Sequence, residues 1–269
     1  MQTGSVQHAL TEAQWGDPGR LPALFSEARR APSLVVIEGF HALKHAIRFG
    51  AELMCVVAVE PAALEALASK LAPDLLGRFT QVAEPIPVEV FRQLSKNLPQ
   101  TQVMAIARRR TCSAEDLVGD PSLGPVIYLE DPRNLGNVGA VVRVAAAAGA
   151  VGVITSGMSD PWDSAAIRGS AGLHFAVPVC RRNQEVDVIP EGRPIVAVDP
   201  QGAPLNAQAI PDRPLLAFGT ERYGLSDQML RRADFKVRIP MRAGVSSLNL
   251  ATSVAVLLYS RSWGQQMPL

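Results

Sequence analysis

The second half of the chain alternates between short apolar runs and longer amphipathic stretches, and this alternation restricts its fold more than any other feature. The runs typical of strands are 126–130, 152–156, 194–198, 215–219 and 235–239. The stretches with helical spacing are 138–149, 162–173, 225–232 and 247–262. Strands separated by helices are typical of a mostly parallel sheet with helices on both faces. We therefore predict an α/β fold for this half.

A smaller α/β pattern precedes it. Apolar runs at 34–38, 53–59 and 103–107 predict strands, with helices between them. Residues 108–124 carry charge together with Gly, Pro and Ser, which is typical of a linker or of a short helix flanked by turns. We predict four parts, namely a tail with one helix (1–32), a small α/β domain (33–107), the linker (108–124) and the larger domain (125–269).

Composition excludes several classes of protein. A chain of 269 residues with 48% hydrophobic and 19% charged residues is long enough for two ordinary cores. Its net charge of +1 provides no global basic field, so any nucleic acid has to be bound by local patches. Cys55, Cys112 and Cys180 lack metal-ligand spacing, which predicts reduced thiols and no metal. Without a signal peptide or an apolar segment long enough for a membrane span, we expect a cytoplasmic protein that does not enter membranes.

Arg143 is the only ionisable residue between Val138 and Ile154, a stretch otherwise made of Val, Ala, Gly and Ile. A guanidinium has five N–H donors and is costly to bury without partners. Such a group either reaches solvent along its stem or points into a site that needs a planar cation. The turn before it, 129–139, is rich in Asn, Gly and acidic residues, which favours a site.

Polar and glycine-rich segments follow three of the predicted strands, at 130–143, 218–226 and 239–259. Ligands of open α/β sheets bind beyond the carboxyl ends of the strands, so these segments are candidates for one site. Each has an ordinary alternative. The first could be a dinucleotide loop, although it lacks the G-x-G-x-x-G spacing. The second could be a plain turn, and the serines of the third could be a helix N-cap, for which Asn249 is not needed.

Taken together, the order N-x-G-x-x-x-R, G-x-E-x-x-G-L-S and I-P-M…S-L-N resembles the SpoU family of SPOUT RNA ribose 2′-O-methyltransferases over about 125–262. Residues 33–107, with VVIEGFHALKHAI, resemble the family's N-terminal substrate-binding domain, a relative of ribosomal proteins. This two-domain layout is similar to that of the ribosomal-RNA enzymes, including the thiostrepton-resistance type. Val144, where the family usually has a small polar residue, is a departure that bears on the substrate.

The resemblance implies a C-terminal trefoil knot that binds S-adenosylmethionine. The residues it assigns to the cofactor are Phe218, Gly219, Thr220, Gly224, Ile239, Met241, Ser247, Leu248 and Asn249. The residues it assigns to catalysis are Arg143, Asn137, Glu221 and Asn249. Among these, Arg143 is the family's catalytic arginine and Glu221 its motif acid.

The resemblance also implies a homodimer and an RNA substrate, most similar to that of ribosomal-RNA enzymes. Arg168, Arg108, Arg109 and Arg110 are the candidates for RNA contacts, and the pairs Arg181–Arg182 and Arg231–Arg232 are further basic patches. Each patch could equally be solvated surface charge.

Four other functions remain open on the sequence. The chain could methylate transfer RNA, could methylate a base instead of a ribose, or could be a non-catalytic RNA-binding member of the fold. A nucleotide-dependent oxidoreductase on a doubly wound sheet is a fourth candidate, and it would bind NAD(P) instead of S-adenosylmethionine.

Overall fold

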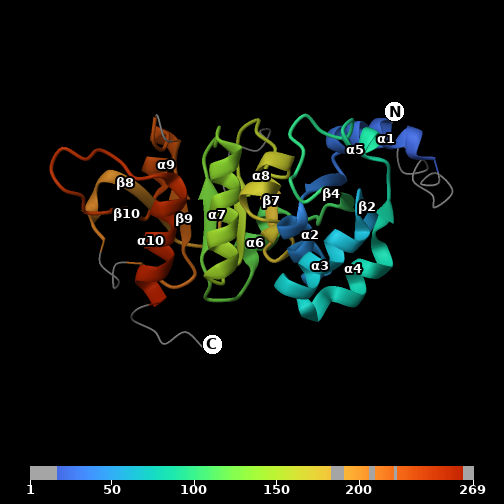
Figure 1. Cartoon of the computed structure of the whole chain (residues 1–269). Coiled ribbons are helices and arrows are strands. Elements are labelled where there is room, and N and C mark those ends of the chain that lie inside the picture. Colours follow the sequence, from blue (N-terminus) through green and yellow to red (C-terminus); the bar gives the residue numbers. More distant parts are fainter. Residues whose placement is uncertain (1–16, 183–190, 206–209, 221–222, 263–269) are drawn as a thin grey trace. The chain divides into compact units, whose positions relative to one another are not determined.

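The chain forms two compact units in a computed structural model that describes residues 17–182, 191–205, 210–220 and 223–262 (Figure 1). Unit 1 comprises Met1–Arg109 together with Trp162–Phe175. Unit 2 comprises Arg110–Pro161 and Ala176–Leu269. Unit 1 is therefore discontinuous in sequence, because a short segment from the second half of the chain belongs to it.

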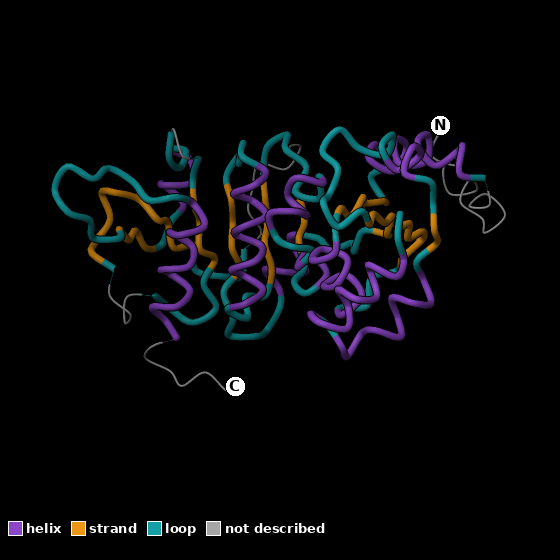
Figure 2. The backbone as a smooth tube through the Cα atoms, viewed as in Figure 1, coloured by secondary structure: helices purple, strands orange, loops and turns teal. Residues whose placement is uncertain are grey.

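Unit 2 is built on a parallel sheet of six strands, which Figure 2 shows in orange. The order of the strands across the sheet is β10-β8-β9-β5-β6-β7, and each neighbouring pair is parallel. Their bounds are β5 Val126–Leu129, β6 Gly152–Thr155, β7 Val179–Arg181, β8 Ile195–Pro204, β9 Leu215–Phe218 and β10 Phe235–Arg238. The predicted α/β fold with a mostly parallel sheet is confirmed.

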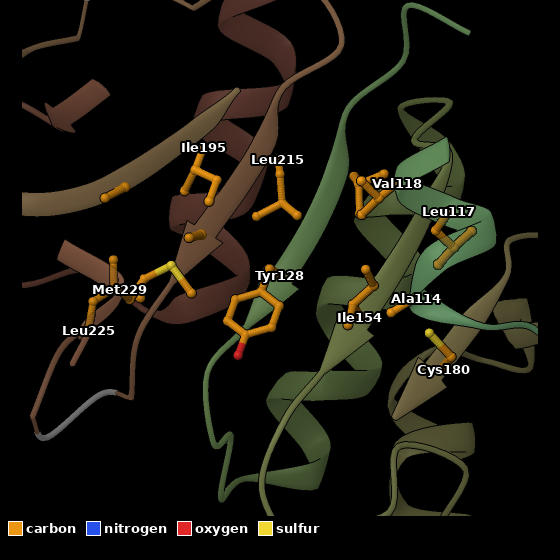
Figure 3. Close-up of a cluster of buried hydrophobic side chains, with 13 residues drawn as sticks. Ala114, Leu117, Val118, Tyr128, Ile154, Cys180, Ile195, Leu215, Leu225 and Met229 are labelled. Atoms are coloured by element: carbon orange, nitrogen blue, oxygen red, sulfur yellow. The ribbon is translucent and has the colours of Figure 1, made fainter. Parts of the chain in front are cut away.

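Helices cover both faces of this sheet. On one face, α6 (Ala114–Gly119) and α9 (Asp227–Arg232) pack on alternate strand residues such as Tyr128, Ile154 and Leu215 (Figure 3). On the other face, α7 (Leu135–Ala147) and α10 (Leu250–Ser262) lie side by side (Figure 1). The strands β5, β6 and β9 are buried along their whole length, which explains why they appear in the sequence as continuous apolar runs.

Unit 1 contains a mixed sheet of four strands in the order β1-β4-β2-β3. The strands are β1 Leu34–Glu38, β2 Leu53–Ala58, β3 Glu84–Pro85 and β4 Val103–Arg108. The helices are η2 Pro18–Arg20, α1 Leu21–Arg30, α2 Phe40–Arg48, α3 Pro61–Leu71, η3 Pro73–Leu75, α4 Leu76–Val82, α5 Val88–Phe91, α8 Ser164–Gly169 and η4 Leu173–Phe175. α1 packs on one apolar face of the strands, and the rings of Phe40 and Phe79 stack 5.3 Å apart.

A buried carboxylate joins the discontinuous segment to the rest of unit 1. Glu38, at the end of β1, has a side chain only 1% exposed. It accepts hydrogen bonds from Arg29 and Ser95, each at 3.0 Å, and forms an ion pair with Arg168 of α8. Just after α8, Gly172 approaches α2 so closely that a Cβ would lie 2.3 Å from the carbonyl oxygen of Ala42. Charge pairing and close backbone packing therefore hold this segment in unit 1.

The predicted strands and most of the predicted helices are confirmed, with differences at their ends. α7 begins at Leu135, three residues before the predicted 138, and α10 begins at Leu250 instead of 247. The sequence reading missed α4, β3 and β7, which are short elements with little periodicity. Within the described ranges, no helix is long and apolar enough to cross a membrane.

Arg193 fixes the loop between α6 and β5 from inside unit 2. Its side chain is fully buried and donates hydrogen bonds to the carbonyl oxygens of Val118, Asp120 and Gly124 at 2.6–3.1 Å. Buried carbonyl groups need partners, and a planar guanidinium can serve several of them at once. We conclude that this residue holds the connection that leads into the parallel sheet.

We expect Arg193→Lys to lower the free energy of unfolding by about 2–4 kcal/mol, because an ammonium cannot reach the same carbonyl groups and leaves some of them buried without partners. Denaturant unfolding of the whole chain measures this loss. Arg231→Lys, at an exposed position on α9, serves as the control and should change stability by less than about 0.5 kcal/mol. Equal stability of the two variants would contradict the role assigned to Arg193.

Candidate functional site

A cavity of about 560 Å³ lies at the carboxyl ends of β9 and β10 in unit 2. Its walls come from four segments of the chain. They are Val198–Pro200 within β8, Phe218–Thr220 with Gly224 at and after the end of β9, Arg238, Ile239 and Met241–Leu248 at and after the end of β10, and Leu250 with Ser253 on α10. The volume lies in the range of small-molecule and cofactor sites. Parallel strands end at the same edge of the sheet, and this is why segments far apart in the sequence meet here.

The turn after β9 forms one wall of the cavity. Thr220 and Gly224 face each other across an antiparallel bridge, with hydrogen bonds of 3.1 and 3.0 Å between their backbones. A Cβ on Gly219 would lie 1.9 Å from the carbonyl carbon of Gly224. Only glycine allows this approach, so the shape of the wall depends on Gly219.

The segment after β10 forms the opposite wall and ends at the N-terminus of α10. Asn249 is the residue before the helix, and its Oδ1 accepts the backbone N–H groups of Ala251 at 2.9 Å and Thr252 at 3.4 Å. Asn249 is thus the N-cap. The alternative in which a serine caps this helix and Asn249 is not needed for capping is wrong, because the helix begins at Leu250, three residues later than the predicted 247.

The NH2 group of the Asn249 side chain reaches α7, the helix that carries Arg143. Its Nδ2 donates a hydrogen bond of 3.1 Å to Oδ1 of Asn137, in the first turn of α7. The backbone N–H of Asn137 is in turn held at 3.1 Å by Oδ1 of Asn134, which caps α7. The two asparagines that the sequence analysis assigned to catalysis are therefore in contact, and each has its backbone fixed at a helix N-terminus.

The turn between β5 and α7 is held by polar contacts to its neighbours. Asp131 has a positive φ of 42°, and its backbone N–H donates to the hydroxyl of Ser156 at 3.0 Å. The Glu130 carboxylate accepts the backbone N–H and the hydroxyl of Ser226, at 2.6 and 2.7 Å. Burial raises the pKa of Tyr128, whose hydroxyl is hydrogen bonded with Ser156. These contacts fix where α7 begins.

Arg143 lies on α7, six residues after Asn137, and its side chain is exposed. It is not among the described residues that line the cavity. The apolar stretch around it is explained by α7 itself, whose residues Val138, Val141, Val142 and Ala145 are buried. The sequence left two alternatives for this guanidinium, namely solvent exposure or burial in a site. In the structure Arg143 is exposed at the surface.

Eight of the nine residues assigned to the cofactor line the cavity, and the ninth, Asn249, lies between two lining residues. Glu221 lies outside the described residues. Sequence reasoning missed Asp199 and Pro200, which enter the cavity from the middle of β8. The signal that could have found them is the Asp-Pro pair that interrupts an apolar strand.

The candidates for RNA contacts lie in unit 1 and at its boundary. Arg108 is paired with Glu52 at 2.6 Å, and Arg109 donates through Nε to the carbonyl oxygen of Leu34. Arg108 lies opposite Leu34 in the sheet register, at the start of β1. Arg168 instead pairs with Glu38 at the other end of that strand, so the structure does not gather these arginines into one patch.

No group of three or more His, Cys, Asp or Glu side chains in the described part of the chain is arranged to hold a metal ion.

Comparison with known proteins identifies similar chains. Residues 124–259 match the SpoU rRNA Methylase family. The chain is 28% identical to the 23S rRNA (adenosine(1067)-2′-O)-methyltransferase of Streptomyces laurentii over 256 residues, which are 90% of this chain and 91% of that enzyme.

Two solved structures share the fold over most of the chain, including parts of both units. A crystal structure of an RNA 2′-O ribose methyltransferase has a TM-score of 0.71 and 28% identity, covering 93% of this chain and 96% of that one. The SpoU methyltransferase AviRb of Streptomyces viridochromogenes, in complex with AdoMet, has a TM-score of 0.74 and 20% identity, covering 92% and 97%.

We expect Gly219→Ala to weaken binding of S-adenosylmethionine at least about tenfold, because the added methyl group has to displace the backbone at Gly224 and deform the cavity wall. Calorimetric titration measures the affinity. Gly119→Ala is the matched control, since a Cβ there meets nothing within 4 Å, and it should bind as the parent does. Equal affinity of both variants would show that this wall does not form the cofactor site.

Proposed function

Since this chain belongs to the SpoU rRNA Methylase family, we propose that it is an enzyme that transfers the methyl group of S-adenosylmethionine to a ribose 2′-hydroxyl of ribosomal RNA. The observation that carries this proposal is the meeting of the two loops after β9 and β10 in one cavity, beside the hydrogen-bonded pair Asn137–Asn249. The 23S rRNA activity of the relative from Streptomyces laurentii supports ribosomal RNA as the substrate.

The cavity fits the proposed cofactor. Gly219 and Gly224 form the backbone wall of the cavity, and the side chains of Ile239, Met241 and Leu248 supply apolar contacts. Asp199 is the acidic side chain among the described lining residues, and a carboxylate suits the positively charged groups of this cofactor. When bound there, S-adenosylmethionine supplies an electrophilic methyl group on a sulfonium.

The protein's own part of the reaction is alignment and charge placement. Methyl transfer is an in-line displacement, so the 2′-oxygen has to be held at a fixed angle to the methyl group. We propose that Asn137 and Asn249 orient the substrate side of the cavity. A guanidinium donates hydrogen bonds and does not accept them, so we assign Arg143 to holding a phosphate or the 2′-oxygen. Glu221 is proposed as the acidic partner within this corner.

We also propose that the chain forms a homodimer with a knotted C-terminal domain. An exposed arginine on α7 can serve a catalytic site only if RNA or a second subunit approaches that helix. Tyr223, Met241, Val245 and Leu248 are large apolar side chains exposed around the cavity, as is common at protein interfaces. The packing of α10 on α7, next to a cavity that the segments after β9 and β10 share, supports the knot. Light scattering of the whole chain tests the dimer.

We propose that unit 1 recognises the RNA. Arg29 and Arg168 share the buried Glu38 carboxylate yet remain 30% and 39% exposed, so each can reach a phosphate while its position is fixed. Arg108, Arg109 and Arg110 are proposed to contact RNA at the other end of the same sheet. Recognition of a folded RNA by shape suits separated contacts of this kind.

Methylation of purified ribosomal and transfer RNA with labelled cofactor tests the function. We expect label in ribosomal RNA, a 2′-O-methylnucleoside on mass spectrometry, and one stop of reverse transcription. Label in transfer RNA alone, a methylated base, or cofactor binding without methyl transfer would each point to one of the other functions that the sequence left open.

We expect Arg143→Ala to reduce turnover by at least about a hundredfold, since a positioned cation near developing negative charge stabilises a transition state by several kcal/mol. The affinity for S-adenosylmethionine should stay unchanged, because the Arg143 side chain does not line the cavity. Single-turnover methylation and calorimetry measure the two quantities. Arg143→Lys keeps the positive charge but loses the planar, bidentate donor group, so its rate should lie between those of Arg143→Ala and the parent. Parental turnover in Arg143→Ala would contradict this role.

Asn249→Asp separates the capping role of Asn249 from its contact with Asn137. Aspartate caps a helix as well as asparagine does but has no N–H to donate. We expect a melting temperature close to that of the parent and turnover at least about tenfold lower. Asn249→Ala should in addition lose about 1 kcal/mol of stability, because the cap is gone. If Asn249→Asp and Asn137→Ala lower turnover additively when combined, the two residues do not act as a pair.

A further inference from the structure

Two of the three cysteines lie in contact on the face of unit 2 that is covered by α6 and α9. Cys180 is on the edge strand β7 and is buried in the core cluster that α6 completes. Figure 3 shows its side chain beside Ala114, the first residue of α6. Cys112, two residues earlier in the chain, packs against the same cluster, and its sulfur is hydrogen bonded with the thiol of Cys180.

The two thiols differ in position and in acidity. Cys112 is partly exposed and lies in a segment outside any helix or strand, whereas Cys180 is buried and fixed in the sheet. The hydrogen bond from Cys180 lowers the pKa of Cys112 and raises the pKa of Cys180. Cys112 is therefore the thiol that ionises first and that a solute can reach.

We infer that Cys112 and Cys180 are a redox-sensitive pair that closes to an intramolecular disulfide when the protein meets a low-molecular-weight disulfide such as oxidised glutathione. The hydrogen bond between the two side chains and their shared place in one core cluster bring the two sulfur atoms together. Residues 110–113 lie outside any helix or strand, so we assign to them the movement that closes the bond, while β7 stays in place. This inference does not depend on the proposed function.

The reaction proceeds by two thiol–disulfide exchanges. The Cys112 thiolate attacks one sulfur of oxidised glutathione, which forms a mixed disulfide and releases one glutathione thiolate. The hydrogen bond that held the proton on Cys180 is then gone, and the Cys180 thiolate attacks the Cys112 sulfur and expels the second glutathione. The two cysteines are oxidised, the glutathione disulfide is reduced to two thiols, and the two protons pass to them.

Cys55 provides a matched control within the same chain. It lies on β2 in unit 1, and burial raises its pKa to about 12. Cys55 is the only cysteine among the residues of unit 1, since Cys112 and Cys180 both belong to unit 2. Cys55 should therefore remain a thiol under conditions that oxidise the pair.

The test is oxidation of the whole folded chain with oxidised glutathione, followed by alkylation, trypsin digestion and mass spectrometry. Cleavage after arginine places Cys112 in the peptide 111–133 and Cys180 in the peptide 169–181. We expect these two peptides to be linked in the parent and in Cys55→Ser, and to separate again after reduction. Cys55 should be recovered unmodified.

The single variants test the order of the two steps. Cys180→Ala keeps the core apolar, and we expect it to stop at a glutathione adduct on Cys112. In Cys112→Ser the remaining thiol at Cys180 is buried, so it should stay reduced. The linked chain should also melt roughly 5–10 °C higher than the reduced chain, because the disulfide closes a long loop. Both variants should lack this shift.

Two results would overturn the inference. One is a parent chain that carries glutathione on Cys112 but never forms the linked peptides. The other is a chain in which both thiols remain reduced in excess oxidised glutathione while the protein stays folded by circular dichroism.

Discussion

The site of this protein depends on one geometric constraint, which is that parallel strands all end at the same edge of their sheet. β9 and β10 are separated in the sheet by β8, yet the turns that follow them face each other across one cavity. The same constraint brings the start of α7, after β5, within hydrogen-bonding distance of the start of α10. Two helix N-termini and two loops are thus gathered without any long-range charge attraction.

Much of this arrangement could be predicted from the sequence, because strands buried on both faces have to be apolar throughout. LVVIE and VIYL correspond to β1 and β5, and the resemblance of the loops after such strands to the SpoU motifs identified eight of the residues that line the cavity. The close approach of Gly219 to Gly224 explains why glycine had to stand there.

Other features could not be predicted, for physical reasons that local sequence does not carry. The sequence left open a serine as the N-cap of α10, since serine and asparagine cap helices about equally well and only the contacts decide between them. Asp199 lines the cavity because β8 is irregular in its middle, where its register with β10 shifts. The pairing of Arg168 with Glu38 depends on tertiary structure alone, because the two residues belong to halves of the chain that look separate in sequence.

That pairing has a consequence for how the polypeptide is made. Unit 1 includes Trp162–Phe175, so the carboxylate at the end of β1 lacks one of its two arginine partners until the ribosome has synthesised α8. By then β5, α7 and β6 of the neighbouring unit have already been made. Domains commonly fold one after another during synthesis, starting at the N-terminus. Here the first unit cannot be completed before the second has begun, and the two maturation steps are interleaved along the growing chain.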